Sequence, residues 1–177
     1  MILSKHATTY GTILALLLLS MHAHALGPST IHPKDEEFKP VRSQRPITLS
    51  GGFLGKTPLL GATLDFDLFP HVGLGVGYGF FSLGGIAASF IPLYIQVYPL
   101  KSNFSPFLEG GADFITLKFD STNVLLSSTF SGMQWIMGAG LEYRFDFGLM
   151  LRTDVIRYIN AAIWAPGLNI GYSFGGI

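Results

Sequence analysis

Carboxylates and arginines at even spacing are the residues of this sequence best suited to chemistry. Within each of four pairs the two members are separated by two or four residues, so in a β-strand both would point to the same face. Such pairs can form buried ion pairs, act as acid and base in catalysis, or line a path for cations. The set comprises Asp65, Asp67, Glu109, Asp113, Glu142, Arg144, Arg152 and Asp154.

Eight segments of alternating apolar and polar residues would carry these charges. A period of two residues is typical of β-strands, and most segments have the roughly 9–11 residues that a tilted strand needs to cross a bilayer. The sequence therefore predicts an all-β fold, namely an eight-stranded antiparallel up-and-down transmembrane β-barrel. The predicted strands are Ile47–Leu54, Leu60–Phe69, Val72–Phe80, Phe90–Tyr98, Pro106–Phe119, Met133–Phe145, Leu149–Tyr158 and Gly167–Phe174.

The connections between these strands fall into two alternating kinds. Short turns are expected on the periplasmic side of an outer-membrane barrel and longer loops on the outer side. The first outer connection, residues 55–59, is the exception because it is short. The predicted short turns are residues 70–71, 99–105 and 146–148, and the predicted longer loops are residues 81–89, 120–132 and 159–166.

Two orientations of the strand faces would fit this alternation. A membrane barrel turns its apolar face outward, whereas a soluble lipid-binding barrel turns it inward. In the third strand, residues 72–80, every second residue is apolar and glycines fill the positions between them. A face of glycine and serine with few charges makes a poor soluble surface, and aromatic residues gather near the strand ends, as in membrane interfaces. We therefore expect the apolar face to point outward and the glycines to make room inside.

The first 25 residues have the pattern of a secretory signal peptide. Lys5 precedes an apolar run from Ile13 to Leu19, and a small-x-small site places cleavage between Ala25 and Leu26. Residues 26–45, which hold seven charged residues and three prolines, are expected to form a flexible periplasmic leader. The barrel would then span residues 46–177.

Composition excludes several classes of function. The chain has 49% hydrophobic and 12% charged residues, and its 11 basic and 11 acidic residues balance, so no nucleic-acid partner is indicated. No segment after the signal peptide has the 18 or so consecutive apolar residues of a helical membrane span. The absence of cysteine excludes disulfides, thiolate metal sites and cysteine nucleophiles. No pattern for a metal or cofactor occurs.

Three segments carry a resemblance to a known family. They are FSPFLEGGADF at residues 104–114, MGAGLEYRFDFGLMLRTDVIRY at residues 137–158, and GLNIGYSFGGI at residues 167–177. With these the chain resembles the small eight-stranded outer-membrane β-barrel family, of the kind seen in OmpA-like transmembrane domains. The resemblance implies residence in the outer membrane of a Gram-negative bacterium, insertion by the barrel-assembly machinery, and a monomeric state.

The expected interior bears on function. An eight-stranded barrel is just wide enough for side chains to fill it, so the six acids and two arginines would form a buried ionic network with Arg144 and Arg152 as its hubs. We expect a structural or surface-interaction role. The alternatives are an envelope-lipid-modifying enzyme and a narrow pore or ligand transporter. The enzyme is disfavoured because the mature chain has only His32, in the leader, and His71, in a periplasmic turn, and neither is placed to activate a nucleophile at the outer leaflet.

Three basic residues are expected at the outer rim of the barrel. Lys56, Lys118 and Arg157 all fall near outer connections in this topology. They could contact the phosphates of lipopolysaccharide, or they could simply be solvated rim charges.

Overall fold

The computed structural model of the protein describes residues 39–119 and 128–175. No helix in this part of the chain is long and apolar enough to cross a membrane. The elements are a one-turn helix, α2 (Val41–Gln44), and the strands β1 (Ile47–Leu54), β2 (Thr57–Phe69), β3 (Val72–Leu83), β4 (Ile86–Val97), β5 (Phe104–Phe119), β6 (Ser128–Arg144), β7 (Leu149–Tyr158) and β8 (Ile163–Phe174).

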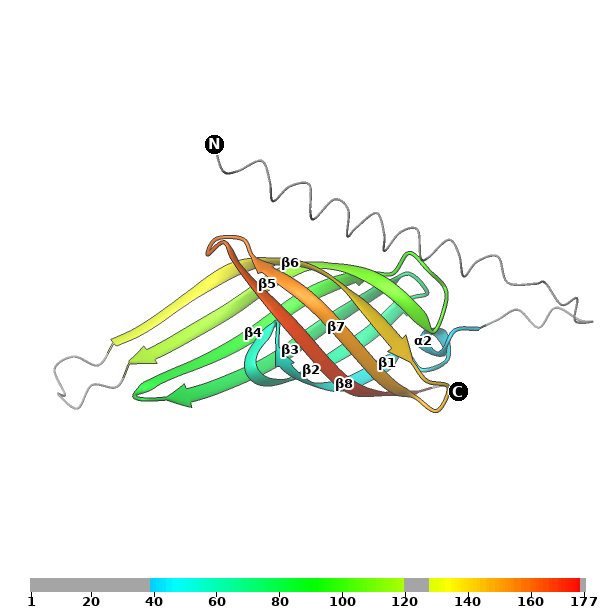
Figure 1. Ribbon diagram of the computed structural model, residues 1–177, viewed down its shortest axis with the longest axis horizontal. Helices are drawn as coiled ribbons and strands as arrows, with labels where there is room; N and C mark the ends of the chain where they lie inside the picture. Colours follow the sequence, from blue (N-terminus) through cyan, green and yellow to red (C-terminus); the bar gives the residue numbers. More distant parts are fainter. Residues whose placement is uncertain (1–38, 120–127, 176–177) are drawn as a thin grey trace, which may run out of the picture. The chain divides into compact units, whose positions relative to one another are not determined.

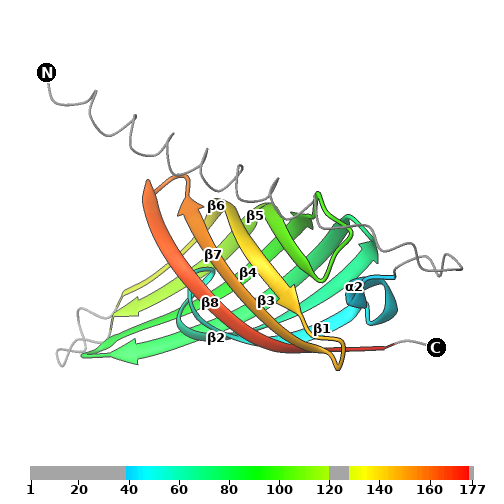
Figure 2. The ribbon, with the colours of Figure 1, turned by 45° about the vertical axis from the view of Figure 1, so that its right-hand side comes forward.

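The eight strands form one closed barrel (Figure 1). Each strand pairs antiparallel with the next along the chain, and β1 closes the barrel by pairing with β8 from Ile47↔Phe174 to Leu54↔Gly167. Figure 2 shows the strands running obliquely around the barrel axis. The predicted fold class, an eight-stranded antiparallel up-and-down barrel, is confirmed.

The apolar face of the strands points outward. In β3, Leu74, Val76, Tyr78 and Phe80 are 37–55% exposed, whereas the glycines between them are buried. β7 alternates in the same way, with Leu151 and Val155 exposed and the charged residues between them buried. The expected orientation of the two faces is therefore confirmed, and the polar face lines the lumen.

The glycines of β3 are required by close packing inside the lumen. A Cβ at Gly79 would lie 2.6 Å from Cβ of Thr57, and one at Gly75 would overlap the ring of Tyr94. Both contacts would be closer than real carbon–carbon contacts, so a side chain at either glycine would displace its neighbour. The glycine face of β3 thus holds space for inward side chains of β2 and β4.

Several strands extend further than the sequence predicted. β3 and β4 meet in a two-residue turn at Gly84 and Gly85, both with positive φ (58° and 81°), so the longer loop expected at residues 81–89 is wrong. The connection after β7 is residues 159–162 only, because β8 begins at Ile163. β6 begins at Ser128, and residues 120–127 of the remaining predicted loop lie outside the described residues. Unpaired backbone groups favour such extension, since continued pairing satisfies them.

We call the two ends of the barrel the turn end and the loop end. The turn end carries α2, the start of β1 and the connections after β2, β4 and β6, and the loop end carries the connections after β1, β3, β5 and β7. The β3–β4 and β5–β6 hairpins reach further at the loop end than the β1–β2 turn does (Figure 1).

Pro92 lies within β4, where it faces the lumen. The ladder between β3 and β4 runs to Val76↔Leu93 and resumes at Gly79↔Phe90, so the pairing is interrupted beside the proline. A proline has no N–H to donate, which accounts for the break.

Candidate functional site: an ionic network inside the barrel

The charged residues singled out from the sequence all lie inside the barrel. The side chains of Asp65, Glu109, Asp113, Glu142, Arg144, Arg152 and Asp154 are at most 6% exposed, and that of Asp67 is 3% exposed. Their even spacing places them on the lumen face of β2, β5, β6 and β7. Buried charges are stable only when they are paired, so their partners decide what the site can do.

Glu142 is the centre of the network at the turn end. Its carboxylate accepts hydrogen bonds from Nη2 of Arg42 at 2.8 Å, Nε of Arg144 at 2.6 Å and Nη2 of Arg152 at 2.7 Å. The hydroxyl of Tyr98 lies 3.2 Å from the same carboxylate and 2.9 Å from Oε1 of Gln96, and these two acceptors share its proton. The sequence indicated the arginines as hubs, whereas in the structure one carboxylate joins three guanidinium groups.

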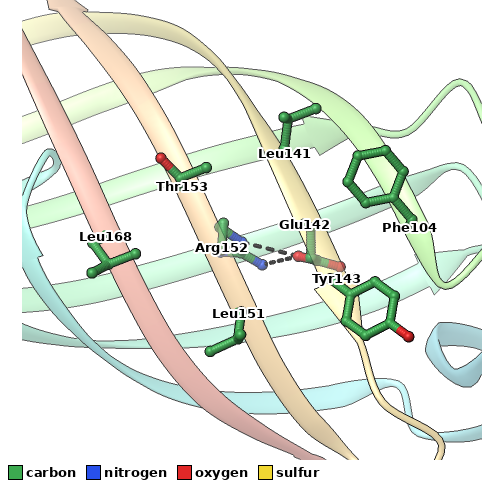
Figure 3. Close-up of a pocket in the computed structure, with 8 residues that line it drawn as sticks. All are labelled: Phe104, Leu141, Glu142, Tyr143, Leu151, Arg152, Thr153 and Leu168. Atoms are coloured by element: carbon green, nitrogen blue, oxygen red, sulfur yellow. Dashed lines mark hydrogen bonds and ion pairs between the residues drawn. The ribbon is translucent and has the colours of Figure 1, made fainter. Parts of the chain in front are cut away.

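Figure 3 shows how Glu142 and Arg152 meet. They lie directly opposite each other on β6 and β7, which brings their side chains together inside the barrel. The residues beside them in each strand, Leu141, Tyr143 and Leu151, line a groove of about 220 Å³ on the outer surface. Charge inside and apolar groups outside thus alternate residue by residue.

Two aspartates of β2 complete the turn-end network. Asp65 accepts a hydrogen bond from Nη1 of Arg152 at 3.0 Å and another from the Tyr94 hydroxyl at 2.7 Å. Asp67 accepts one from Nη1 of Arg144 at 2.7 Å. Bonds between charged groups of this kind are about twice as strong as neutral ones, so the network ties β2, β4, β6 and β7 together.

The sequence predicts that Arg42 belongs to the flexible leader, but the structure places it in the lumen. The residue lies in α2 and is 1% exposed. Its guanidinium carbon lies 3.4 Å from the centroid of the Tyr98 ring, and its Nε is 3.5 Å from Asp67. The backbone N–H of Val41 donates to Oδ1 of Asn103 at 3.0 Å, which anchors the helix to the β4–β5 connection. The sequence signal that pointed this way was the excess of six acids over two arginines.

Lys56 was expected at the outer rim, and this placement is wrong because the residue is buried. It is 3% exposed, and its Nζ lies 2.5 Å from Glu109 and 3.6 Å from Asp154. The register between β1 and β2 shifts after Gly52, and the turn has positive φ at Leu54 (62°) and Gly55 (72°). This irregular turn directs Lys56 into the barrel. Its ammonium group there pairs with two buried carboxylates, which are stable only with a cationic partner.

Arg42 and Lys56 change the charge balance of the lumen. The six acids face four bases, since Arg42 and Lys56 join Arg144 and Arg152, and the excess falls from four carboxylates to two. Gln96 donates to Glu109 at 3.1 Å and Asn169 donates to Asp154 at 3.2 Å, which compensates these two acids further. Asp113 differs, because within the described residues it forms no ion pair.

The other two rim residues are exposed. Lys118 lies near the loop end of β5 and Arg157 near that of β7. The guanidinium carbon of Arg157 lies 5.4 Å from the centroid of the Trp164 ring, its neighbour on β8. His71 is at the turn end, where its Nδ1 is 2.7 Å from the carbonyl oxygen of Tyr98. Among the described residues no group of three or more His, Cys, Asp or Glu side chains could hold a metal ion.

Comparisons with known proteins agree with the fold. No protein-family model matches the sequence, and no curated protein matches it significantly. Among solved structures, the N-terminal β-barrel domain of Pseudomonas aeruginosa OprF matches with a TM-score of 0.61 and 16% identity, over 72% of this chain and 96% of that domain. Ail of Yersinia pestis matches with a TM-score of 0.49 and 11% identity, over 72% of this chain and 93% of Ail. The Neisserial surface protein NspA matches with a TM-score of 0.48 and 10% identity, over 72% and 94%.

The fold therefore defines the class of protein to which this architecture corresponds. The chain has the architecture of the small eight-stranded outer-membrane β-barrels, as its sequence resemblance implied.

Proposed function

We propose that this chain is an integral outer-membrane protein of a Gram-negative bacterium with a structural or surface-interaction role, in which the barrel is a filled scaffold. The observation that carries the proposal is its outward face, where large apolar side chains are exposed along all eight strands. A barrel surface of this kind is stable in hydrocarbon and unfavourable in water.

The interior supports a scaffold in place of a pore. At the turn end, Arg42 and the Tyr98 ring cover the Glu142 network. Toward the loop end, the β1–β2 turn directs Lys56 between Glu109 and Asp154. Ion pairs across the lumen at this density favour a closed barrel, so we expect recordings in planar bilayers to detect no stable conductance. Lipid A from a deletion strain should likewise be unchanged in mass if the barrel is not a lipid-modifying enzyme.

A charge placed on the outward face tests the membrane assignment. Val76→Arg places a charge on the outward face of β3, where an arginine near the middle of a bilayer costs about 2–4 kcal/mol. Leu83→Arg is the matched control, since Leu83 ends β3 and is 74% exposed, and a charge near the interface costs about 0–1 kcal/mol. Unfolding titrations in lipid vesicles measure both. Equal tolerance of the two substitutions, together with recovery of the protein in the soluble fraction, would overturn the proposal.

The exposed rim bases fit contact with an anionic lipid. We infer that Arg157, beside Trp164, and Lys118 contact lipopolysaccharide phosphates, since guanidinium groups bind phosphate bidentately and indole rings favour the membrane interface. Replacing both by glutamine should lower the free energy of unfolding in lipopolysaccharide-containing vesicles and leave that in neutral lipid vesicles unchanged. Lys101→Gln, at an exposed position of the turn end, is the control. An unchanged stability of the double variant in lipopolysaccharide-containing vesicles would exclude this contact.

A further inference from the structure

A cavity of about 320 Å³ lies in the lumen at the loop end of the barrel. We call it the loop-end cup. Its apolar walls include Phe90, Ile115, Ile163 and Ala165, and Gln134 and Tyr158 are the lining residues that carry a polar side-chain group. Ile163 is 57% exposed, so the wall it forms reaches the surface of the protein.

The cup shares Tyr158, Ile115 and Ala165 with the apolar cluster of the barrel. Ile136, Ile156, Tyr94 and Tyr158 pack together, with Ile115 and Ala165 against them. A ligand in the cup would therefore place its body against hydrocarbon and aromatic groups, which favours an apolar molecule.

Asp113 is a buried carboxylate without a cation, and it lies next to two residues that line the cup, Tyr158 and Gln134. It is 0% exposed, and within the described part of the chain it has no ion pair. Its Oδ2 lies 3.3 Å from the Tyr158 hydroxyl, but the same hydroxyl is 3.2 Å from the carbonyl oxygens of both Gly55 and Lys56. One hydroxyl has one proton to donate, so three acceptors compete for it.

A second acceptor oxygen is placed next to Asp113. Gln134 is its direct partner in the β5–β6 ladder, so both side chains enter the lumen at the same height. Oδ1 of Asp113 and Oε1 of Gln134 are both buried and accept no hydrogen bond from the described residues. Buried polar atoms without partners are rare in folded proteins. Here two acceptors, one of them on an acid, stand together at an apolar cavity.

We propose that the loop-end cup binds a small organic ammonium ion with an apolar body, which donates its N–H groups to Asp113 and Gln134 and packs its body against Phe90, Ile115 and Ala165. The ammonium supplies both the missing positive charge and the missing donors, whereas a neutral alcohol supplies a donor only and a carboxylate supplies neither. The cup's volume limits the ligand to about the size of a substituted benzene ring. Other carboxylates of the lumen do not offer such a site, because Glu109, Asp154 and Glu142 already contact cationic side chains.

Titration calorimetry with the full barrel in nanodiscs tests this site, with benzylamine as the probe and empty nanodiscs as the blank. Benzyl alcohol has the same body without the charge, and methylamine has the charge without the body. We expect benzylamine to bind at least about tenfold more tightly than either, because a charge-assisted hydrogen bond is about twice as strong as a neutral one. Equal heats for benzylamine and benzyl alcohol would overturn the proposal.

Substitutions locate the binding. Asp113→Asn keeps the shape and removes the charge, so it should reduce benzylamine affinity about tenfold and leave benzyl alcohol unchanged. Ala165→Phe fills the cup and should abolish binding of both probes. Asp146→Asn removes an exposed carboxylate at the turn end and should change nothing. Unaltered benzylamine binding by both cup variants would mean that the amine binds elsewhere and that the assignment is wrong. Heat-modifiable migration on gels verifies that each variant is folded, and the outcome does not depend on the proposed scaffold role.

Discussion

The two halves of the lumen are lined by the same strand faces but have opposite chemistry. At the turn end, Glu142 accepts hydrogen bonds from three guanidinium groups, and Asp65 and Asp67 each accept a further one, from Arg152 and Arg144. At the loop end, apolar side chains surround the cup, and Asp113 next to its lining residues forms no ion pair within the described residues. A buried acid thus stabilises the barrel in one half and is a cost in the other, which shows that burial alone does not set its contribution.

The largest expected effect follows from exchanging one acid in each half for its amide. Glu142→Gln leaves three buried guanidinium groups without their shared anion, so the free energy of unfolding should fall by about 3–5 kcal/mol. Asp113→Asn removes an unpaired buried charge, so the same quantity should rise by about 1 kcal/mol. Urea or guanidinium titrations in detergent measure both.

The critical result is that the two substitutions change the free energy of unfolding in opposite directions. If both amides lowered the stability by similar amounts, Asp113 would have a cationic partner in solution and the contrast between the halves would be lost. The exposed Asp146→Asn substitution serves as the baseline, with an expected change of about 0.5 kcal/mol or less.

A smaller effect is expected from removing the arginine that α2 brings to the turn end. Arg42→Met deletes a charged hydrogen bond to Glu142 and the cation–π contact with Tyr98, which should lower the free energy of unfolding by about 1.5–3 kcal/mol. Cleavage of the segment from Pro40 to Gln44 by a protease of broad specificity, such as proteinase K, should also become faster, because α2 loses its anchor.

Gln44→Met is the control for this substitution, since Gln44 is an exposed residue of the same helix. It should change the stability by about 0.5 kcal/mol or less. If Arg42→Met behaved like this control, α2 would lie on the barrel without stabilising it, and the turn end would be closed by Arg144 and Arg152 alone.

The fold was predictable from local pattern because a period of two residues is read directly from the chain. The alternation of Leu74, Val76 and Tyr78 with glycines predicted both the strand and its orientation, and the structure has both. Strand ends were less predictable. Gly84 and Gly85 close β3 and β4 in a tight turn, although adjacent apolar residues, such as Phe80 with Phe81 and Ala87 with Ala88, obscure the period of two.

The site was only partly predictable, since strand parity identifies charges that belong to strands. Arg144 and Arg152 follow this rule, whereas Arg42 and Lys56 enter the lumen from a helix and a turn. Phe90, Tyr98, Phe107 and Tyr158 also point inward, although their positions near strand ends suggested an aromatic belt facing the membrane interface. For Phe90, Phe107 and Tyr158, strand parity indicates the direction of the side chain better than the position near a strand end does.

The sequence by itself determined the eight strands, the outward apolar face and the acidic lumen, because each depends on which neighbours along the chain share a face. Only the tertiary structure decided how that lumen is neutralised. Long-range contacts bring Arg42 to Glu142 and Lys56 to Glu109 across 100 and 53 residues of sequence. Unpaired carboxylates attract distant cations strongly only in the closed barrel, because only the closed barrel excludes water from the lumen.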